Sequence, residues 1–479
     1  MKIPKYPPLR SVRLPEQLRI RVPDFRQKFK QLQMQGQPIT LEGRITNIRQ
    51  MLKKTYFFDI IQDNTKIQLL ATTNSTKLDS ESFKEHFMLF NKNDSVHATG
   101  LPHITGTGEL LIKLDRPMVS CSPAVREVPS KLVDRSQINS RRVAHYISLA
   151  EARKVLTIKS KVLQLIRNYF LNRDFVEVQT PLLAESGTGA NATPFITRSK
   201  ALENDQQLQL RVAPEIWLKK LVIGGFDKVF EIGQNFRNEG IDGTHNPEFT
   251  SCEFYQTWTD LDELMNITEE LFAQLNVDVG SPIEFKPIIK YEFVPTIEKM
   301  TGIPFPKVLD QTSLLDYFAK LDIPFPEIKS PLILLDTLCS TYLEPLSNEN
   351  QPIFIYNQPA ELSPLAKSTE IEYGGGRKYD ISLRFEMFIN GREYVNAYEE
   401  ENSPETQKHK FELQQRAKTE YLDPESQIPD WHYIEDMKYG LPPTGGWGCG
   451  IDRLVMLFAG VSRIEDVLSF GNLRDVIRQ

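Results

Sequence analysis

The stretch FEIGQNFRNEGIDGTHNPEFTSCEFYQTW, residues Phe230–Trp258, decides the fold of the larger part of this chain. Both of its ends alternate in the manner of β-strands, and a polar loop separates them. Residues two apart in a strand share a face. One face of the second strand therefore carries Phe249, Ser251, Glu253 and Tyr255. An aromatic ring, a carboxylate and a phenol together are unusual in a core, and they indicate a ligand platform.

The loop of this hairpin offers groups that suit a phosphate. Arg237 and Glu239 share a face near the loop. The planar fork of an arginine can donate two hydrogen bonds to a phosphate at once. The same two residues also fit a surface ion pair, so the rest of the chain has to decide between the two interpretations.

A glycine-rich segment, GWGCGIDR at Gly446–Arg453, precedes the apolar run Leu454–Phe458. Glycines let a backbone approach a ligand closely, and Arg453 is predicted to lie in the first turn of the helix that follows. Glycine-rich turns before helices are common, so this segment alone is weak evidence of function.

An acidic segment, GREYVNAYEEEN at Gly391–Asn402, suits Mg²⁺, which proteins usually hold by one or two acids together with substrate phosphates. A solvated acidic loop is the alternative. Glu393 and Glu400 are seven residues apart, so a flat strand would place them on opposite faces. A bulge or bend is needed if both face one site.

Further out, the pattern predicts a helix from Val155 to Phe170, a strand at Phe175–Val178 and a hairpin at Asn390-Gly391. Nearer the N-terminus, five short strands are expected, with a turn at Asp63-Asn64. They are Ile39–Ile48, Thr55–Ile61, Lys66–Ala71, Ser95–Leu101 and Leu110–Lys113. Five strands in so short a segment suggest an OB-fold barrel, which often binds single-stranded nucleic acid.

Taken together, these segments resemble the class II aminoacyl-tRNA synthetases. The helix that begins at Val155 and the strand after it resemble the family's motif 1, FRNE at Phe236–Glu239 resembles motif 2, and GWGCGIDR resembles motif 3. The lysine branch fits best, because it also shows RVAPEIWLKKLVIGGF, HNPEFT, ELSPLAK and GLPPTGG. The N-terminal extension and the barrel together are most similar to those of the fungal mitochondrial lysyl-tRNA synthetases.

The resemblance implies an α+β fold, in which a six-stranded antiparallel sheet flanked by helices follows an N-terminal five-stranded OB-fold β-barrel. The expected parts are a basic extension (1–37), the anticodon-binding barrel (38–125), a linker (126–150) and the catalytic domain (151–479). Within the catalytic domain, motif 1 is expected at about 154–181, motif 2 at about 228–258 and motif 3 at about 445–458. Residues 262–350 show no chemistry in the sequence.

The resemblance also implies roles for single residues. Arg237 is expected to hold the α-phosphate of ATP, Arg453 the γ-phosphate, and Phe249 to stack on the adenine. Glu239, His245, Asn246 and Gly450 complete the expected ATP site. Glu393 and Glu400 are expected to bind Mg²⁺. The work is positioning and electrostatics, with no covalent enzyme intermediate.

Recognition of the lysine side chain needs buried acceptors for its ammonium group. The implied lysine site consists of Gly189, Glu215, Glu253, Tyr255, Asn402 and Gly448. The implied anticodon site consists of Arg49, Phe58, Gln68 and Glu109, with an aromatic ring that stacks on a base. Phe57 and Phe58 are adjacent, so one of them must face the barrel core, and the sequence leaves open which.

Composition agrees with a globular enzyme: 40% of the 479 residues are hydrophobic and 25% are charged. No apolar run approaches the ~20 residues of a membrane span, so no membrane partner is expected. The net charge is −6, but residues 1–60 hold thirteen Lys or Arg against four Asp or Glu, which suits tRNA phosphates or a solvated face. The four scattered cysteines argue against a zinc ribbon or a disulfide scaffold.

The resulting prediction is a lysine–tRNA ligase that uses ATP, L-lysine and tRNA-Lys and forms a homodimer through motif 1. The mitochondrial matrix is the expected compartment, with the cytoplasm as the alternative. Three rival functions remain: an inactive RNA-binding paralogue, an aspartyl- or asparaginyl-type synthetase, and a ligase that attaches lysine to a protein. An acidic substrate would be repelled by Glu215 and Glu253, and a protein-modifying relative would lack the N-terminal barrel.

Overall fold

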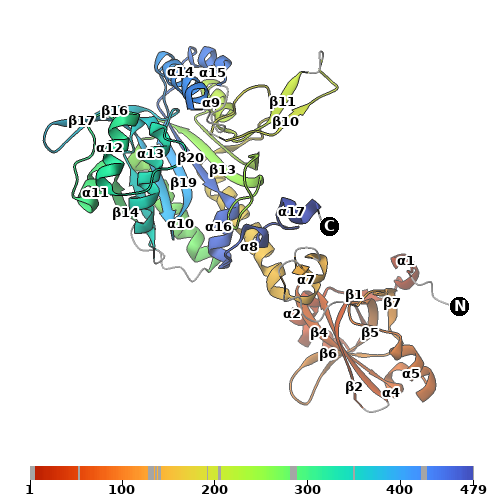
Figure 1. The fold of residues 1–479 in the computed structure, drawn as a ribbon. Coiled ribbons are helices and arrows are strands. Elements are labelled where there is room, and N and C mark those ends of the chain that lie inside the picture. The colour runs from red at the N-terminus through yellow and green to blue at the C-terminus, as the bar shows by residue number, and fades with distance from the viewer. Residues whose placement is uncertain are drawn as a thin grey trace. The chain divides into compact units, whose positions relative to one another are not determined.

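The computed structural model describes residues 6–51, 54–127, 134, 137–138, 142–190, 192–202, 206–280, 288–348, 351–421 and 429–477. Contacts between its residues divide the chain into two compact units, Met1–Ala150 and Glu151–Gln479. Figure 1 shows the helices and strands of both units.

The first unit is built on a closed barrel of five strands. Its strand order is β2-β3-β4-β6-β5, and the pairing of β5 with β2 closes the ring. The strands are β2 (Ile39–Gln50), β3 (Thr55–Gln62), β4 (Thr65–Thr72), β5 (Ser95–Ile104) and β6 (Leu110–Leu114). Short strands β1 (Leu18–Arg19) and β7 (Val119–Ser122) extend the sheet at β2 and β5. The predicted OB-like barrel is therefore confirmed.

The turn between β3 and β4 shows how local sequence sets this barrel. Asp63 and Asn64 both have positive φ, 50° and 55°, and they form the whole connection between the two strands. Asn and Asp tolerate this conformation better than most residues, and it matches the twist of a tight hairpin. The predicted turn at Asp63-Asn64 is thus confirmed.

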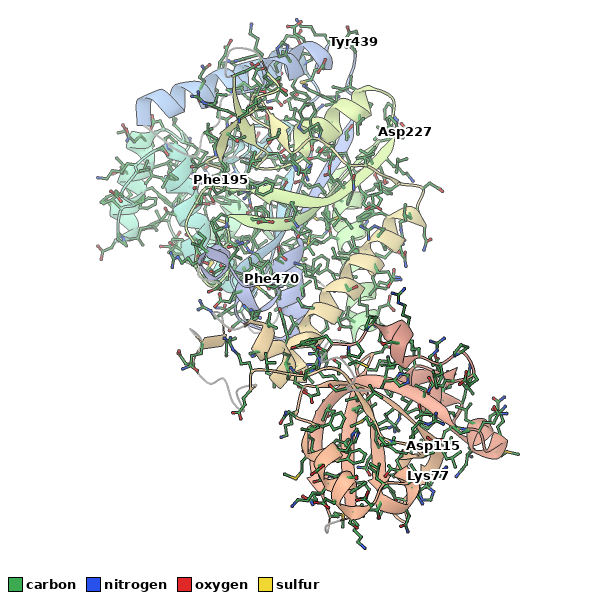
Figure 2. All side chains as sticks on the ribbon, turned by 90° about the vertical axis from the view of Figure 1, so that its right-hand side faces the viewer. Lys77, Asp115, Phe195, Asp227, Tyr439 and Phe470 are labelled. Carbon is green, nitrogen blue, oxygen red and sulfur yellow. The ribbon has the colours of Figure 1, made fainter. Side chains whose placement is uncertain are left out.

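The N-terminal helices α2 (Val22–Gln27) and α3 (Phe29–Gln35) belong to the barrel's core. Val22, Phe25 and Phe29 are buried in the same cluster as the inward side chains of the strands. The predicted extension is therefore packed against the barrel from Val22 onward, although its basic residues are largely exposed. Helices α4 (Thr73–Thr76) and α5 (Ser80–Met88) join β4 to β5, and side chains fill the barrel interior (Figure 2).

The second unit is built on a sheet of eight strands in the order β14-β15-β18-β19-β20-β13-β12-β8. The central six are antiparallel, as predicted: β15 (Ile353–Tyr356), β18 (Arg384–Ile389), β19 (Arg392–Glu399), β20 (Thr444–Gly450), β13 (Glu248–Thr257) and β12 (Lys228–Phe236). At each edge one short strand pairs in parallel, β14 (Ile289–Glu292) and β8 (Val176–Glu177). These two strands are an addition to the predicted sheet.

Helices cover the two faces of this sheet unequally (Figure 1). On one face, α8 (Ala150–Leu171), α10 (Leu261–Val279) and α16 (Ile451–Ala459) share a large core with Phe230, Phe254 and Trp447 of the strands. On the other face, α9 (Glu215–Ile223), α14 (Pro404–Tyr421) and α15 (Trp431–Met437) form a smaller core with Val229 and Tyr255. These helices leave the rest of the second face of the sheet uncovered.

Three further groups of elements complete the second unit. Helices α11 (Phe293–Thr301), α12 (Gln311–Leu321) and α13 (Pro331–Leu338) pack beside β15 and account for most of the 262–350 region. A small sheet contains β9 (Leu183–Ala184), β10 (Ile196–Arg198) and β11 (Gln207–Leu210), and a hairpin contains β16 (Ser368–Tyr373) and β17 (Arg377–Ser382). The short helix α17 (Leu473–Ile477) also belongs to the second unit, whereas the short helices α1 (Leu9–Val12) and α7 (Arg142–Ser148) belong to the first.

The hairpin of β18 and β19 contains both of the irregularities expected from the sequence. Asn390 and Gly391 connect the strands with φ of 53° and 66°, as an Asn-Gly turn requires. The pairing then shifts, because Phe388 pairs with Glu393 whereas Met387 pairs with Val395. Tyr394 is the extra residue of this bulge, which brings Glu393 to the face that Asn396 and Tyr398 share.

The linker between the two predicted domains is only partly described. Part of the predicted linker 126–150 falls outside the described residues, and α7 lies in its described part. In the described part of the chain, no helix combines the length and apolar character of a membrane span.

Candidate active site

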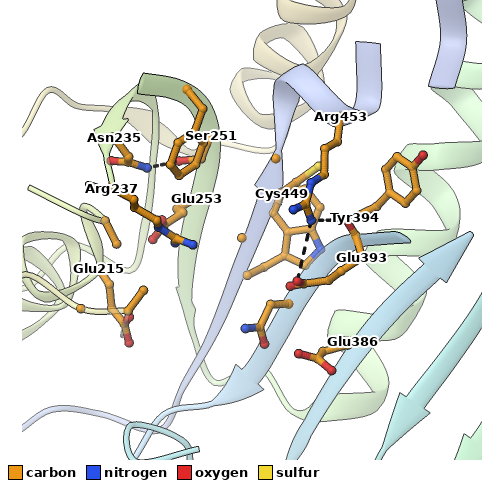
Figure 3. Close-up of a pocket in the computed structure, with 18 of the residues that line it drawn as sticks. Glu215, Asn235, Arg237, Ser251, Glu253, Glu386, Glu393, Tyr394, Cys449 and Arg453 are labelled. Atoms are coloured by element: carbon orange, nitrogen blue, oxygen red, sulfur yellow. Dashed lines mark hydrogen bonds and ion pairs between the residues drawn. The ribbon is translucent and has the colours of Figure 1, made fainter. Parts of the chain in front are cut away.

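A cavity of about 470 Å³ lies on the open face of the second unit's sheet (Figure 3). Strands β12, β13, β19 and β20 form its floor, and the loop between β12 and β13 forms one wall. Thirteen of the predicted residues line it: Gly189, Glu215, Arg237, Glu239, His245, Asn246, Phe249, Glu253, Tyr255, Glu393, Gly448, Gly450 and Arg453. The sheet thus brings together residues separated by more than 250 positions in the chain.

Arg237 follows directly after β12 and points into this cavity (Figure 3). Its guanidinium carbon lies 5.1 Å from the centre of the Phe249 ring, and its main-chain NH donates to the carbonyl of Pro247 at 2.8 Å. The buried side-chain Nε has no hydrogen-bond partner among the described residues. A buried donor without an acceptor is costly, so Arg237 is suited to an anionic ligand.

His245 connects the loop to the second arginine. Its Nδ1 lies 2.8 Å from Asp242 Oδ2, and its Nε2 lies 2.7 Å from a terminal nitrogen of Arg453. The loop also carries Glu239, whose Oε1 accepts from the main-chain NH of Thr193 at 3.3 Å. The carboxylate of Asp242 therefore orients a histidine that in turn contacts Arg453.

Asn246 lines the cavity, but its side chain also has structural partners. Its Nδ2 donates to the carbonyl of Glu248 at 2.7 Å, and its Oδ1 accepts from the main-chain NH of Leu473 at 3.0 Å. These bonds hold the loop against the start of α17, so its placement is explained without a ligand.

Arg453 lies in the first turn of α16, as predicted, and Gly450 precedes the helix. Its neighbour Asp452 is buried and accepts from the main-chain NH of Thr250 at 2.7 Å and from Lys159 Nζ at 2.5 Å. One carboxylate thereby joins α8, β13 and α16. This junction fixes the helix that presents Arg453 to the cavity.

Glu393 is open to the cavity, with 39% of its side chain exposed. It lies 4.0 Å from a guanidinium nitrogen of Arg453, and burial together with Glu386 raises its pKa. Glu386 also lines the cavity, where it pairs with Arg384 and accepts from Gln358 at 2.7 Å. Two neighbouring carboxylates with an incomplete countercharge suit a divalent cation.

Glu400 has a different environment from Glu393. Its side chain is fully covered, and its Oε2 lies 2.7 Å from Lys219 Nζ. Its Oε1 is buried without a hydrogen-bond partner among the described residues, beside the backbone of Gly446. In this structure Glu386, not Glu400, lines the cavity with Glu393, and the pairing of Glu393 with Glu400 at one metal stays a prediction.

Two neighbouring carboxylates, those of Glu215 and Glu253, form an acidic end of the cavity. Glu215 and Glu253 face it from α9 and β13. The hydroxyl of Tyr398 donates to Glu215 Oε1 at 2.5 Å, and the hydroxyl of Tyr255 donates to Glu253 Oε2 at 3.3 Å. Burial, reinforced by Glu215, raises the pKa of Glu253 to about 8. This end is therefore built to receive positive charge.

Two glycines leave room at this acidic end. Gly189 has φ of 137°, and a Cβ there would lie 2.7 Å from Oε2 of Glu215. Gly448 lies directly opposite Glu253 on the neighbouring strand. Both glycines line the cavity, and a close approach of the amino-acid ligand to the backbone at these positions stays a prediction.

Asn402 is a correction to the predicted lysine site. It does not belong to the cavity lining, and its Oδ1 accepts from Lys367 Nζ at 2.6 Å. Its Nδ2 reaches the carbonyl of Leu441 at 3.5 Å. The amide connects the chain after β19 to its neighbours, a role that depends on partners distant in sequence.

Comparison with known proteins agrees with this geometry. The family model described as tRNA synthetases class II (D, K and N) matches residues 136–474. The mitochondrial lysine–tRNA ligase of Schizosaccharomyces pombe is 36% identical over 98% of this chain and 91% of its own length, and that of Saccharomyces cerevisiae is 37% identical over 92% and 83%. This chain belongs to the class II lysine–tRNA ligases. The lysine–tRNA ligase of Photobacterium profundum is 34% identical over 94% of this chain and 90% of its own length, so the similarity extends to bacterial members.

For a lysine–tRNA ligase the outer face of the barrel is a second region of interest, and here Phe58 is a correction. Its side chain has no exposed surface, and it packs in the barrel core 5.9 Å from the ring of Tyr56. A base cannot stack on a ring that is covered on all sides. The predicted stacking role of Phe58 is therefore wrong for this structure, because its neighbour Phe57 is the one that faces outward.

Two of the other predicted barrel residues, Arg49 and Gln68, both contact Asp59. Arg49 lies with its guanidinium carbon 6.0 Å from the centre of the Phe57 ring and reaches Asp59 at 3.7 Å. Gln68 donates to the same Asp59 at 3.2 Å. Glu109 is exposed just before β6, which pairs with β4 at Gln68. A half-buried ring, a cation and an amide thus share one outer face.

Several cavity residues were not identified from the sequence: Asn235, Arg384, Glu386, Asn396 and Tyr398. Alternation along β19 could have indicated Asn396 and Tyr398, because they share a face once the bulge is placed. Arg384 and Glu386 required the pairing of β18 with β19, which is a tertiary fact.

Proposed function

We propose that this chain activates L-lysine with ATP and transfers it to the 3′ end of tRNA-Lys. The observation that carries the proposal is that one cavity is lined both by the arginines Arg237 and Arg453 and by the carboxylates Glu215 and Glu253. Triphosphate and ammonium groups need those opposite charges. Membership of the lysine–tRNA ligases supports the same assignment.

In the first step, the lysine carboxylate attacks the α-phosphorus of ATP, the bond to the β-phosphate oxygen breaks, and pyrophosphate leaves with lysyl-adenylate remaining bound. Arg237 has an unpaired donor where negative charge develops on the α-phosphate. Arg453 holds the γ-phosphate, and Phe249 stacks on the adenine. Glu239, His245 and Asn246 keep the loop in place. In the second step, a terminal tRNA hydroxyl attacks the lysyl carbonyl and AMP leaves.

Class II synthetases generally use Mg²⁺ with ATP. Glu393 fits this cation because its carboxylate is open to the cavity and only weakly paired. We assign Glu393 as the principal ligand, with Glu386 or Glu400 as the second acid. No group of three or more metal-ligating side chains gathers in the described residues, which agrees with a cation held mainly by phosphates. When bound, Mg²⁺ would neutralise phosphate charge.

The acidic end of the cavity favours lysine as the amino-acid substrate over aspartate and asparagine. Glu215 and Glu253 present negative charge, with Tyr255 and Gly448 beside them. An aspartate or asparagine side chain would leave these carboxylates without a cation, and such an unpaired site rejects the wrong substrate strongly. The acidic end thus favours lysine over the substrates of the aspartyl and asparaginyl enzymes.

The barrel supplies the proposed tRNA contact. We assign Arg49, Phe57 and Gln68 as an anticodon-binding patch, with Glu109 at its margin. A half-buried ring can stack on an unpaired base, and the amide of Gln68 can read its edge. Phe57 replaces Phe58 in this assignment.

ATP–pyrophosphate exchange with each of the twenty amino acids, with and without tRNA, tests the proposal. Exchange with lysine alone, followed by charging of tRNA-Lys, is the expected result. Folded protein that exchanges no amino acid would instead support the inactive RNA-binding paralogue.

Two further assignments follow from the family. A homodimer through motif 1 is proposed because large apolar side chains are exposed along that segment and directly after it, among them Leu171, Val176, Leu182 and Leu183. Sedimentation that shows only monomer at micromolar concentration would contradict it. The mitochondrial matrix is proposed because the fungal relatives named above are mitochondrial. Localisation of a tagged full-length chain outside mitochondria would contradict that assignment.

A further inference from the structure

Lys219 lies beneath the acidic end of the cavity without lining it. Its side chain has no exposed surface, and its Nζ lies 2.9 Å from Glu215 Oε1 and 2.7 Å from Glu400 Oε2. Glu215 and Lys219 are four residues apart on α9, so the helix places them on one face. Glu400 comes from the end of β19, and the Tyr433 ring, 5.5 Å away, closes the site from α15.

This ammonium occupies one side of the carboxylate that is assigned to the substrate. Oε1 of Glu215 accepts from both Lys219 and the hydroxyl of Tyr398, at 2.9 and 2.5 Å. Oε2 lies on the other side, next to Gly189, where a Cβ would come within 2.7 Å of it. Since Gly189 lines the cavity, the second oxygen is the one directed toward a ligand.

The space for Glu400 is also part of the arrangement. A Cβ on Gly446 would lie 2.0 Å from Glu400 Oε1 and 2.7 Å from the Tyr255 ring. Only a glycine at this position of β20 leaves room for the carboxylate that holds Lys219 from the far side. Three elements, α9, β19 and β20, thus combine to place one ammonium group.

We propose that Lys219 is a positioning residue for lysine recognition, which fixes Oε1 of Glu215 so that Oε2 meets an ammonium group of the substrate. This inference rests on the proposed function. Glu215 without Lys219 keeps only one of its two described contacts at Oε1, and its carboxylate is free to turn away from the cavity. Lysine binding then loses a charge-assisted hydrogen bond, whereas the ATP end, which Lys219 does not contact, is unaffected.

A purely structural role for Lys219, as a buried ion pair that stabilises α9, makes a different prediction. Loss of one partner of such a pair destabilises a protein as a whole, so both substrates would bind less well. Lys220 offers a matched control on the same helix. It pairs with Asp430 at 2.8 Å and with Asp436 at 3.3 Å, away from the cavity acids.

The experiment measures KM for lysine, KM for ATP and kcat by ATP–pyrophosphate exchange in wild type, K219M, K220M, E215Q and E215Q/K219M. K219M is expected to raise the KM for lysine about tenfold or more, because one charge-assisted hydrogen bond is lost. The KM for ATP should stay within about twofold, and K220M should match wild type. In the E215Q background, K219M should add less than about threefold, because it acts through Glu215.

An unchanged KM for lysine in folded K219M overturns the inference. Equal increases in the KM for lysine and the KM for ATP also overturn it. So does a KM for lysine in E215Q/K219M that rises by the product of the two single effects. If circular dichroism shows that K219M does not fold, Y398F decides, because it removes the other contact to Oε1. A selective rise in the KM for lysine then supports the inference, and an unchanged value overturns it. Wild-type protein without lysine-dependent exchange overturns the proposed function and this inference together, which distinguishes that failure from an unaffected variant.

Discussion

Replacing Glu253 by glutamine is expected to remove a pH dependence from lysine binding. Burial and the nearby Glu215 raise the pKa of Glu253 to about 8, so most molecules without substrate carry a proton there at neutral pH. An ammonium ligand prefers the ionised carboxylate, and binding therefore displaces that proton. Between pH 6 and 8 the affinity of the wild-type protein for lysine should rise about tenfold per pH unit and then level off.

The same shift predicts a stability change of definite sign. Glu253 is ionised in the unfolded chain at pH 7 but protonated in the folded one, so folding takes up a proton and the stability of the wild-type protein falls as pH rises from about 4.5 toward 8. At pH 7 this costs on the order of 3 kcal/mol, and glutamine, which never ionises, avoids it. E253Q should therefore be more stable than wild type at pH 8 and nearly equal to it below pH 4.5.

Calorimetric titration of lysine, without ATP or tRNA, tests the reasoning. Experiments at pH 6, 7 and 8 in two buffers of different ionisation enthalpy report the number of protons released, which should be about one at pH 7 in wild type. The ε-ammonium group of the ligand stays charged throughout this range. Constant wild-type affinity between pH 6 and 8, or the same slope in E253Q, would refute the assignment of Glu253.

Four other substitutions test the remaining assignments. Arg237→Ala should lower kcat for adenylate formation by about 10²–10³-fold without loss of fold, because it removes a donor from the developing charge; activity within a few-fold of wild type would reject the phosphate role. Phe57→Ala should weaken charging of tRNA-Lys but leave ATP–pyrophosphate exchange and stability unchanged. Phe58→Ala, which truncates a core side chain, should lower the free energy of unfolding measured in urea by about 3–5 kcal/mol. The reverse pattern would restore Phe58 to the tRNA site. Gly446→Ala places a Cβ 2.0 Å from Glu400 Oε1, so the KM for lysine should rise about tenfold while the KM for ATP changes little; a wild-type KM for lysine would show that Glu400 can move without consequence.

The elements that were predicted correctly are those whose signal is local. The strands on both sides of the Arg237 loop alternate with period two, and Asn390-Gly391 suits a tight turn wherever it occurs. Arg453 follows a glycine and precedes an apolar helical run, so its place in the first turn of α16 depends only on neighbouring residues. The order of three such motifs was enough to indicate the family.

The barrel shows where local information ends. The alternation of side chains along a strand established that Phe57 and Phe58 point to opposite sides of β3. It does not say which of the two sides faces the barrel core. The closure of β5 on β2 and the packing of α2 and α5 decide which side is the interior. The sequence therefore narrowed the anticodon ring to two candidates, and tertiary packing selected Phe57.

At the active site the sequence determined the residue types, and the tertiary structure decided their partners. Glu215, Glu253 and Glu400 were identifiable as acids of a lysine site or a metal site, but each carboxylate depends on groups far away in the chain. Lys219 holds Glu400 across 181 positions, and Lys367 holds the amide of Asn402 across 35. Contacts between residues so far apart in the sequence cannot be predicted from their sequence spacing. The strength of a charge interaction depends on the distance in space, and α9, β19 and β20 converge only once the sheet has formed.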